Sequence, residues 1–79
     1  MSLKDRLLAF LKRNYPITYA KGSLCDMARD SDLKATGETT GRRLRELQNE
    51  GKVTVSYKKG HAYYAYKLPV IYQPLAYKD

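Results

Sequence analysis

One short segment carries the residues best suited to binding a ligand. Arg42, Arg43 and Arg45 follow closely after Thr39. A guanidinium group makes two parallel hydrogen bonds to a phosphate, or to the O6 and N7 atoms of guanine. A threonine hydroxyl donates to a base or to the backbone, and its methyl group packs against thymine. The segment therefore has the chemistry to bind a nucleic acid.

Further basic residues lie elsewhere in the chain. Lys58 and Lys59 are close to His61, and Lys21 adds a cation nearer the N-terminus. The chain has fifteen Lys and Arg residues against eight Asp and Glu, a formal net charge of +7 in 79 residues. This excess predicts a polyanionic partner, either a nucleic acid or an anionic membrane surface. The alternative is a basic domain whose charge serves only its solubility.

The other reactive residues do not form a recognisable catalytic or metal site. Cys25 is the only cysteine, so we expect no intramolecular disulfide, and with His61 it supplies too few ligands for tetrahedral zinc. A catalytic cysteine–histidine pair also needs a third group to orient it, and no spacing suggests one. Asp26, Asp30 and Asp32 lack the spacing of a calcium loop. We therefore expect no enzyme, cofactor or metal, and we interpret Cys25 as a small core residue.

Length and hydropathy limit the setting of the protein. Seventy-nine residues make one domain with a modest core. The most apolar run, residues 7–11, is too short to cross a bilayer, and the N-terminus lacks the pattern of a secretory signal. We expect a reduced, cytoplasmic protein with no membrane partner and no small-molecule effector.

Three helices are predicted to position the basic residues. Apolar residues recur at helical spacing in three segments, Leu3–Arg13, Lys21–Asp30 and a third that runs through Leu44 and Leu47. Ser2 and Asp5 resemble a capping box at the start of the first helix. Thr36 is the predicted N-cap of the third helix, and Gly51 is predicted to end it in the left-handed conformation. Residues 31–35 connect the second helix to the third.

Three short segments have the composition of strands. Ile17–Tyr19 is β-branched and aromatic, Val53–Tyr57 alternates between apolar and polar residues, and Ala62–Leu68 is rich in tyrosine. The last two flank a turn at residues 58–61 and so predict a β-hairpin. The order of helix, short strand, two helices and hairpin indicates a compact α+β fold.

The turn also predicts how the hairpin pairs. With Lys59 and Gly60 as its two central residues, the expected pairs are Val53 with Tyr66, Val55 with Tyr64, and Tyr57 with Ala62. Because paired residues share a face, the two valines, Tyr64 and Tyr66 are predicted to be buried. The residues predicted to face outward are Thr54, Ser56, Tyr63 and Ala65.

A helical wheel divides the third helix into two sides. Thr40, Leu44 and Leu47 share one narrow arc, which we predict faces the core. Thr39, Arg42 and Arg43 fall on the other side, and Arg45 lies further round the exposed surface. The alternative is a solvated face on which the arginines pair with local acids, as Arg42 is spaced to do with Glu38 and Glu46.

Gly41 is unexpected inside this helix, where glycine costs roughly 1 kcal/mol relative to alanine. We interpret it as a site where another backbone approaches closely, either the second helix or a DNA strand.

Residues 39–53, TTGRRLRELQNEGKV, resemble the segment of winged helix regulators that joins the recognition helix to the wing. In that family a small or β-branched residue, two leucines three apart and a helix-ending glycine precede the first wing strand. The resemblance covers residues 3–68 in the order of elements. It implies a winged helix-turn-helix with three helices, a short first strand and a C-terminal hairpin wing. It also implies that the third helix enters the major groove and the wing lies against a neighbouring phosphate backbone or minor groove.

Together these features predict a module that binds double-stranded DNA, as a sequence-specific transcriptional regulator. The predicted DNA-binding residues are Thr39, Arg42, Arg43, Arg45, Lys58, Lys59, His61 and Lys21. Two alternatives stay open at this point. One is a winged helix that binds protein, and the other is binding of RNA or of nucleic acid without sequence preference.

The segment 69–79 is predicted to be an apolar, proline-containing tail that follows a domain of residues 1–68. Its apolar residues exceed what a loop requires; they are Val70, Ile71, Tyr72, Leu75 and Tyr77. They predict either packing against the first helix or a homodimer interface. A homodimer would suit the palindromic sites that such regulators commonly bind.

Overall fold

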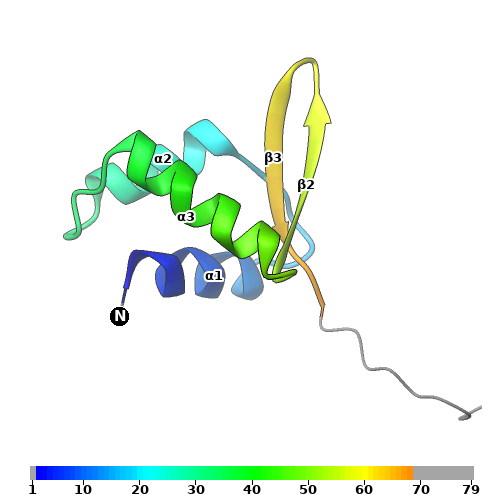
Figure 1. Cartoon of the computed structure of the whole chain (residues 1–79), viewed down its shortest axis with the longest axis horizontal. Coiled ribbons are helices and arrows are strands. Elements are labelled where there is room, and N and C mark those ends of the chain that lie inside the picture. Colours follow the sequence, from blue (N-terminus) through cyan, green and yellow to red (C-terminus); the bar gives the residue numbers. More distant parts are fainter. Residues whose placement is uncertain (1, 69–79) are drawn as a thin grey trace, which may run out of the picture.

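The computed structural model describes residues 2–68 and has three helices and a small antiparallel sheet (Figure 1). The elements are α1 (Leu3–Arg13), β1 (Tyr19–Ala20), α2 (Lys21–Asp30), α3 (Gly37–Asn49), β2 (Val53–Lys58) and β3 (His61–Tyr66). The predicted α+β class is confirmed, as are the ranges of the first two helices. The tail at 69–79, with its predicted packing or dimerisation, lies outside the described residues.

Local capping signals set the ends of the helices. The Ser2 hydroxyl accepts a hydrogen bond from the Asp5 amide, and the Thr36 hydroxyl accepts one from the Thr39 amide, each at 3.1 Å. These bonds satisfy amides that have no partner within the helix. At the end of α3, Gly51 has a φ of 75°, and the next amide, of Lys52, donates to the Leu47 carbonyl at 3.0 Å. The predicted caps at Thr36 and Gly51 are therefore confirmed.

The hairpin turns through two residues with positive φ. Lys59 has a φ of 51° and Gly60 one of 81°, as a type I′ turn requires. The turn fixes the register, and the three predicted pairs, Val53–Tyr66, Val55–Tyr64 and Tyr57–Ala62, are all present. The strands are ordered β1-β3-β2, so β3 is central.

All three strand ranges differ from the prediction, and β2 does so only by one added residue, Lys58. The first strand is Tyr19–Ala20 rather than 17–19, because the Ile17 amide still donates to the Asn14 carbonyl in the turn after α1. Pairing with β3 begins only at Tyr19, opposite Tyr64. The last strand runs over His61–Tyr66 rather than 62–68, since the two-residue turn already pairs His61 with Lys58.

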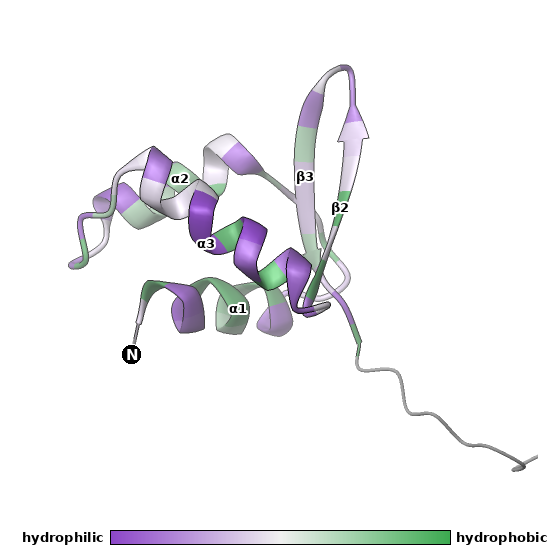
Figure 2. Ribbon diagram, in the orientation of Figure 1, coloured by the Kyte–Doolittle hydropathy of each residue, from purple (hydrophilic) through white to green (hydrophobic). Residues whose placement is uncertain are grey.

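The core lies where α1, α2, α3 and the base of the hairpin meet. Its fully buried members are leucines from the three helices together with Thr40; they are Leu7, Leu11, Leu24, Leu44 and Leu47. Val53 and Tyr64 extend this core onto the sheet. In Figure 2 green segments alternate with purple ones along the helices, and the tip of the hairpin is pale to purple. The predicted buried stripe of α3 is confirmed.

Four predictions about single residues are wrong. Val55 and Tyr66, predicted to be buried, are only half-buried, because they pack at the edge of the core. Ala65 was expected to face outward but is only 8% exposed, because its small side chain sits on the central strand and is shielded by its neighbours. Cys25 is half-buried rather than a core residue. It lies one position after Leu24, which takes the buried side of α2, and its Sγ atom is 3.8 Å from the Gly37 carbonyl oxygen.

Leu44 and Thr40 offer a matched test of the core. Leu44→Ala should lower the free energy of unfolding by about 2–5 kcal/mol, because it leaves a cavity at the crossing of the helices. Thr40→Val should lower it by about 0.5–1.5 kcal/mol at most, the net contribution of one hydrogen bond. The Thr40 hydroxyl donates only to the Thr36 carbonyl, which keeps its bond from the Thr40 amide. Urea unfolding measures both, and a Thr40→Val loss as large as that of Leu44→Ala would contradict this account.

Candidate nucleic-acid interface

The exposed side of α3 carries two arginines that form no ion pair with any other residue of the range 2–68. Arg42 and Arg45 are both exposed. None of the ion pairs formed within residues 2–68 includes either of them. The predicted alternative, in which Arg42 pairs with Glu38 or Glu46, is therefore not observed. Both guanidinium groups keep their donors available for a ligand.

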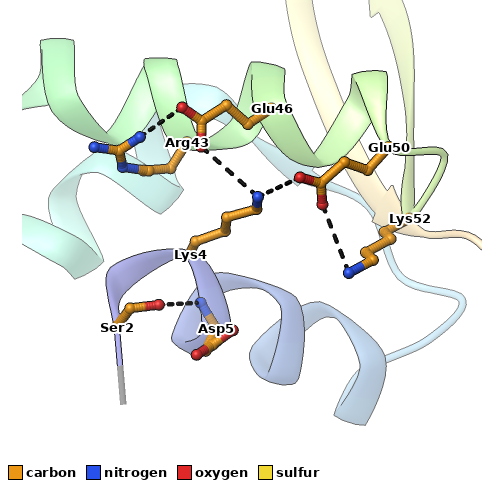
Figure 3. Close-up of polar contacts among 7 residues, drawn as sticks. All are labelled: Ser2, Lys4, Asp5, Arg43, Glu46, Glu50 and Lys52. Atoms are coloured by element: carbon orange, nitrogen blue, oxygen red, sulfur yellow. Dashed lines mark hydrogen bonds and ion pairs between the residues drawn. The ribbon is translucent and has the colours of Figure 1, made fainter.

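Arg43 lies on a different flank of α3, the one that faces α1. Its guanidinium donates to Glu46 one turn along the helix. The Lys4 ammonium of α1 lies 3.8 Å from the same carboxylate and also donates to Glu50 (Figure 3). Lys52 is 3.6 Å from Glu50 and completes a chain of five charged residues. The structure therefore does not bring Arg43 together with Arg42 and Arg45.

This chain of charges separates the two flanks of α3 by sign. Two of the acids of α3 and its C-cap, Glu46 and Glu50, are held on the α1 side by Lys4 and its neighbours. The side of α3 that faces Lys21 of α2 keeps Arg42 and Arg45, with Glu38 as its acid. A helix whose composition is mixed in sequence thus presents a mainly cationic side in space.

Lys21 joins the arginines because Gly41 leaves room for it. A Cβ atom at position 41 would lie 3.1 Å from the Lys21 Cε atom and 3.2 Å from its Nζ atom. The close approach predicted at Gly41 is therefore made by a lysine side chain of α2, and not by the backbone of that helix. Lys21, Arg42 and Arg45 line one hollow of about 260 Å³. Three cations from two helices converge there.

The hairpin carries three of the predicted basic residues at its outer end. Lys58 and Lys59 are exposed at the tip, and His61 is exposed opposite Lys58. His61 and Lys21 line the same open cleft, about 640 Å³ in volume, between the hairpin and the first turns of α2 and α3. Of the predicted hairpin residues, His61 therefore shares one space with Lys21, whereas Lys58 and Lys59 do not line it.

Thr39 stands at the start of α3 and is half-buried. The Thr36 hydroxyl donates to the Thr39 hydroxyl at 3.0 Å and accepts from the Thr39 amide. The Thr39 hydroxyl hydrogen stays available to donate. Its position is fixed by the cap, so it would meet a ligand with little loss of side-chain entropy.

Sequence reasoning missed Tyr57, Gly22 and Glu38, which also line the cleft. Tyr57 continues the alternation of Val53 and Val55, so the sequence did indicate that it lies on the same face of the hairpin as these two residues. That face extends past the core at this point, and Tyr57 is 71% exposed. The charge chain through Lys4 and Glu50 had no local signal, since its partners are 46 residues apart.

The described part of the chain offers neither a metal site nor a membrane span. Residues 2–68 contain no group of three or more His, Cys, Asp or Glu side chains placed to hold a metal ion. Within the same range no helix is long and apolar enough to cross a membrane. Comparison with protein-family models, curated proteins and solved structures finds no match to this chain.

Two ion pairs of α1 depend on pH. Lys4 pairs with Glu50 at the end of α3, and Arg6 pairs with Asp32 in the connection between α2 and α3. The hydrogen bond from Lys4 holds the pKa of Glu50 below its ordinary value of 4.5, and the hydrogen bond from Arg6 holds the pKa of Asp32 below 3.8. A carboxylate with a lowered pKa in the folded state stabilises that state above its unfolded pKa. This contribution is lost as the pH falls through the folded value.

We therefore expect the thermal unfolding midpoint to fall as the pH drops below about 4.5. Glu50→Gln should remove part of this fall, and Lys4→Met should remove the same part because it deletes the partner. The measurement is a series of thermal melts between pH 3 and pH 7. An unchanged pH dependence in both variants would show that the pair does not contribute.

Proposed function

We propose that this chain is a winged helix-turn-helix domain that binds duplex DNA, and that it acts as a sequence-specific transcriptional regulator. The observation that carries the proposal is the separation of charge on α3. Its unpaired arginines lie beside Lys21, while Glu46 and Glu50 are neutralised on the opposite flank. A protein that binds a polyanion needs such a face, and a merely soluble basic domain does not.

In this proposal α3 is the recognition helix. The major groove of B-DNA is about 12 Å wide and admits one α-helix. Arg42 and Arg45 project from the exposed side of α3 and would donate to guanine edges or to phosphates. Thr39 would contact a base or the backbone at the start of the helix. Arg43 would orient α3 against α1 through Glu46, instead of reading a base.

The hairpin is the proposed wing. Its tip carries Lys58 and Lys59 away from the core, and both side chains are exposed. Lysine on a flexible stem is suited to phosphate, which carries no sequence information. Lys21 and His61 would add contacts from the cleft between the wing and α3. The wing would therefore supply affinity, and the helix would supply sequence preference.

A single recognition helix covers one half-site of a typical operator. We propose that two copies bind a palindromic site, with residues 69–79 as the candidate contact between them. The apolar residues of that segment motivate this step.

Binding measured against salt tests the function directly. We expect a selected duplex to bind roughly a thousandfold or more tighter than a random duplex. The logarithm of affinity should fall linearly with the logarithm of salt concentration, with a slope that reports the phosphates contacted. Single-stranded RNA serves as the competing ligand. Equal affinity for RNA and for both duplexes would contradict the proposal and favour general nucleic-acid binding, and no binding to any of them would favour a protein partner.

Substitutions on the two flanks of α3 should separate reading from orientation. Arg42→Ala and Arg45→Ala should each weaken binding to the selected duplex by about 1–3 kcal/mol if they read a base. Arg43→Ala, the matched control on the α1 flank, should weaken it much less. Lys59→Ala should weaken all duplexes about equally and flatten the salt slope. If Arg43→Ala proves the most damaging of the four, the assignment of flanks is wrong.

A further inference from the structure

The cleft beside the hairpin has a feature that the basic residues do not explain. It is bounded by the first turns of α2 and α3 on one side and by the outer half of the hairpin on the other. Three of the five glycines of the chain line it, namely Gly22, Gly37 and Gly60. Gly60 is required by its turn, where φ is 81°. The other two need a separate explanation.

Gly22 and Gly37 are not required by the fold. Both lie in helices, and neither has a positive φ. A Cβ atom at Gly22 would meet nothing within 4 Å, and one at Gly37 would meet only the Cys25 Sγ atom at 3.9 Å, an ordinary contact. Gly41 differs, because Lys21 occupies the space beside it. Glycine weakens a helix relative to alanine, so two glycines without an internal reason point to a ligand that approaches from the cleft.

We propose that this cleft holds one sugar–phosphate strand of the bound duplex, with Gly22 and Gly37 as the points of closest approach. The inference rests on the proposed DNA-binding function and names the part of the DNA that occupies this site. An element in the major groove and a neighbouring element in the minor groove are separated by the sugar–phosphate strand that divides the two grooves. With α3 in the major groove and the hairpin reaching toward the minor groove, the strand between the grooves would pass through the cleft that separates the hairpin from the first turns of α2 and α3.

Tyr57 faces the two glycines from the hairpin side of the cleft. Its side chain is 71% exposed, although it shares the inner face of the hairpin with the buried Val53 and the half-buried Val55. A tyrosine in this position packs its ring against a deoxyribose and donates its hydroxyl to a phosphate oxygen. Lys21, held beside Gly41, supplies the charge from the helix side. The strand is thus contacted from both walls.

Glu38 also lines the cleft and is the only carboxylate among its lining residues. It offsets part of the positive charge of Lys21. Affinity in the cleft therefore depends on close packing and hydrogen bonds as well as on charge. A methyl group added at Gly22 or Gly37 would disturb this packing without changing any charge, so an alanine at either position tests it directly.

The test uses Gly22→Ala, Gly37→Ala and Tyr57→Phe, with Ser23→Ala as the control. Ser23 is exposed in the first turn of α2 and does not line the cleft. The two glycine variants should melt at the same temperature as wild type or higher, since alanine favours a helix. They should bind the selected duplex roughly fivefold or more weakly, because a methyl group intrudes on a packed contact. Their salt slope should stay unchanged, because no charge is lost.

A second measurement locates the strand. The selected duplex is prepared with one phosphate at a time replaced by an uncharged methylphosphonate. We expect one or two adjacent positions to weaken wild-type binding, and Tyr57→Phe to lose nothing further on the DNA modified there. Such non-additivity is the sign of a direct contact.

The outcomes separate this inference from the proposed function. If wild type shows no preference for duplex DNA, the proposed function fails and this inference fails with it. If wild type binds the selected duplex while both glycine variants and Tyr57→Phe bind as tightly as Ser23→Ala, the function stands and the cleft does not hold a strand.

Discussion

The burial of a narrow stripe on α3 is the constraint on which the rest of the structure depends. Thr40, Leu44 and Leu47 are at most 1% exposed, and they fix the rotation of α3 about its own axis. A helix turns about 100° per residue, so a fixed stripe decides where every other side chain of α3 points. It turns Arg43 toward α1 and leaves Arg42 and Arg45 facing out. A change in this packing would therefore alter the charged surface without altering any charge.

The electrostatic arrangement follows from that rotation. Surface ion pairs contribute little energy individually, and the pairs around Lys4 are all partly exposed. Their larger effect is on the distribution of charge, because they gather Glu46 and Glu50 on the flank of α3 that faces α1. Without this pairing, the acids would lie among the cations, and the net charge of +7 would be distributed more evenly over the surface. Like charges concentrated on one face repel one another and destabilise the free protein, and an anionic ligand relieves that repulsion.

The parts of the fold that could be predicted are those with local causes. Thr36 and Gly51 mark the ends of α3 through bonds to residues a few positions away, and the two-residue turn at Lys59 and Gly60 determines the whole register of the hairpin. The start of β1 could not be predicted as well, because it depends on where β3 offers a partner. The same holds for Ala65, which lies on the central strand and is shielded by neighbours from other segments. Neighbours from other segments decide where a short strand begins and whether a residue is exposed, and the sequence of one segment does not indicate those neighbours.

The candidate site divides in the same way. A helical wheel separates Arg42 from the buried stripe, but it cannot say which flank of the helix will meet α1, and so it could not distinguish Arg43 from Arg45. Gly41 shows the limit most clearly. From sequence its missing side chain indicates only that something comes close, and the structure identifies that neighbour as Lys21. Gly22 and Gly37 lie in helices but have no such close neighbour. Each lowers helix stability relative to alanine, and no contact inside the described protein explains that loss. The structure therefore makes these two glycines evidence about the surface of the cleft, which the amino-acid composition alone does not provide.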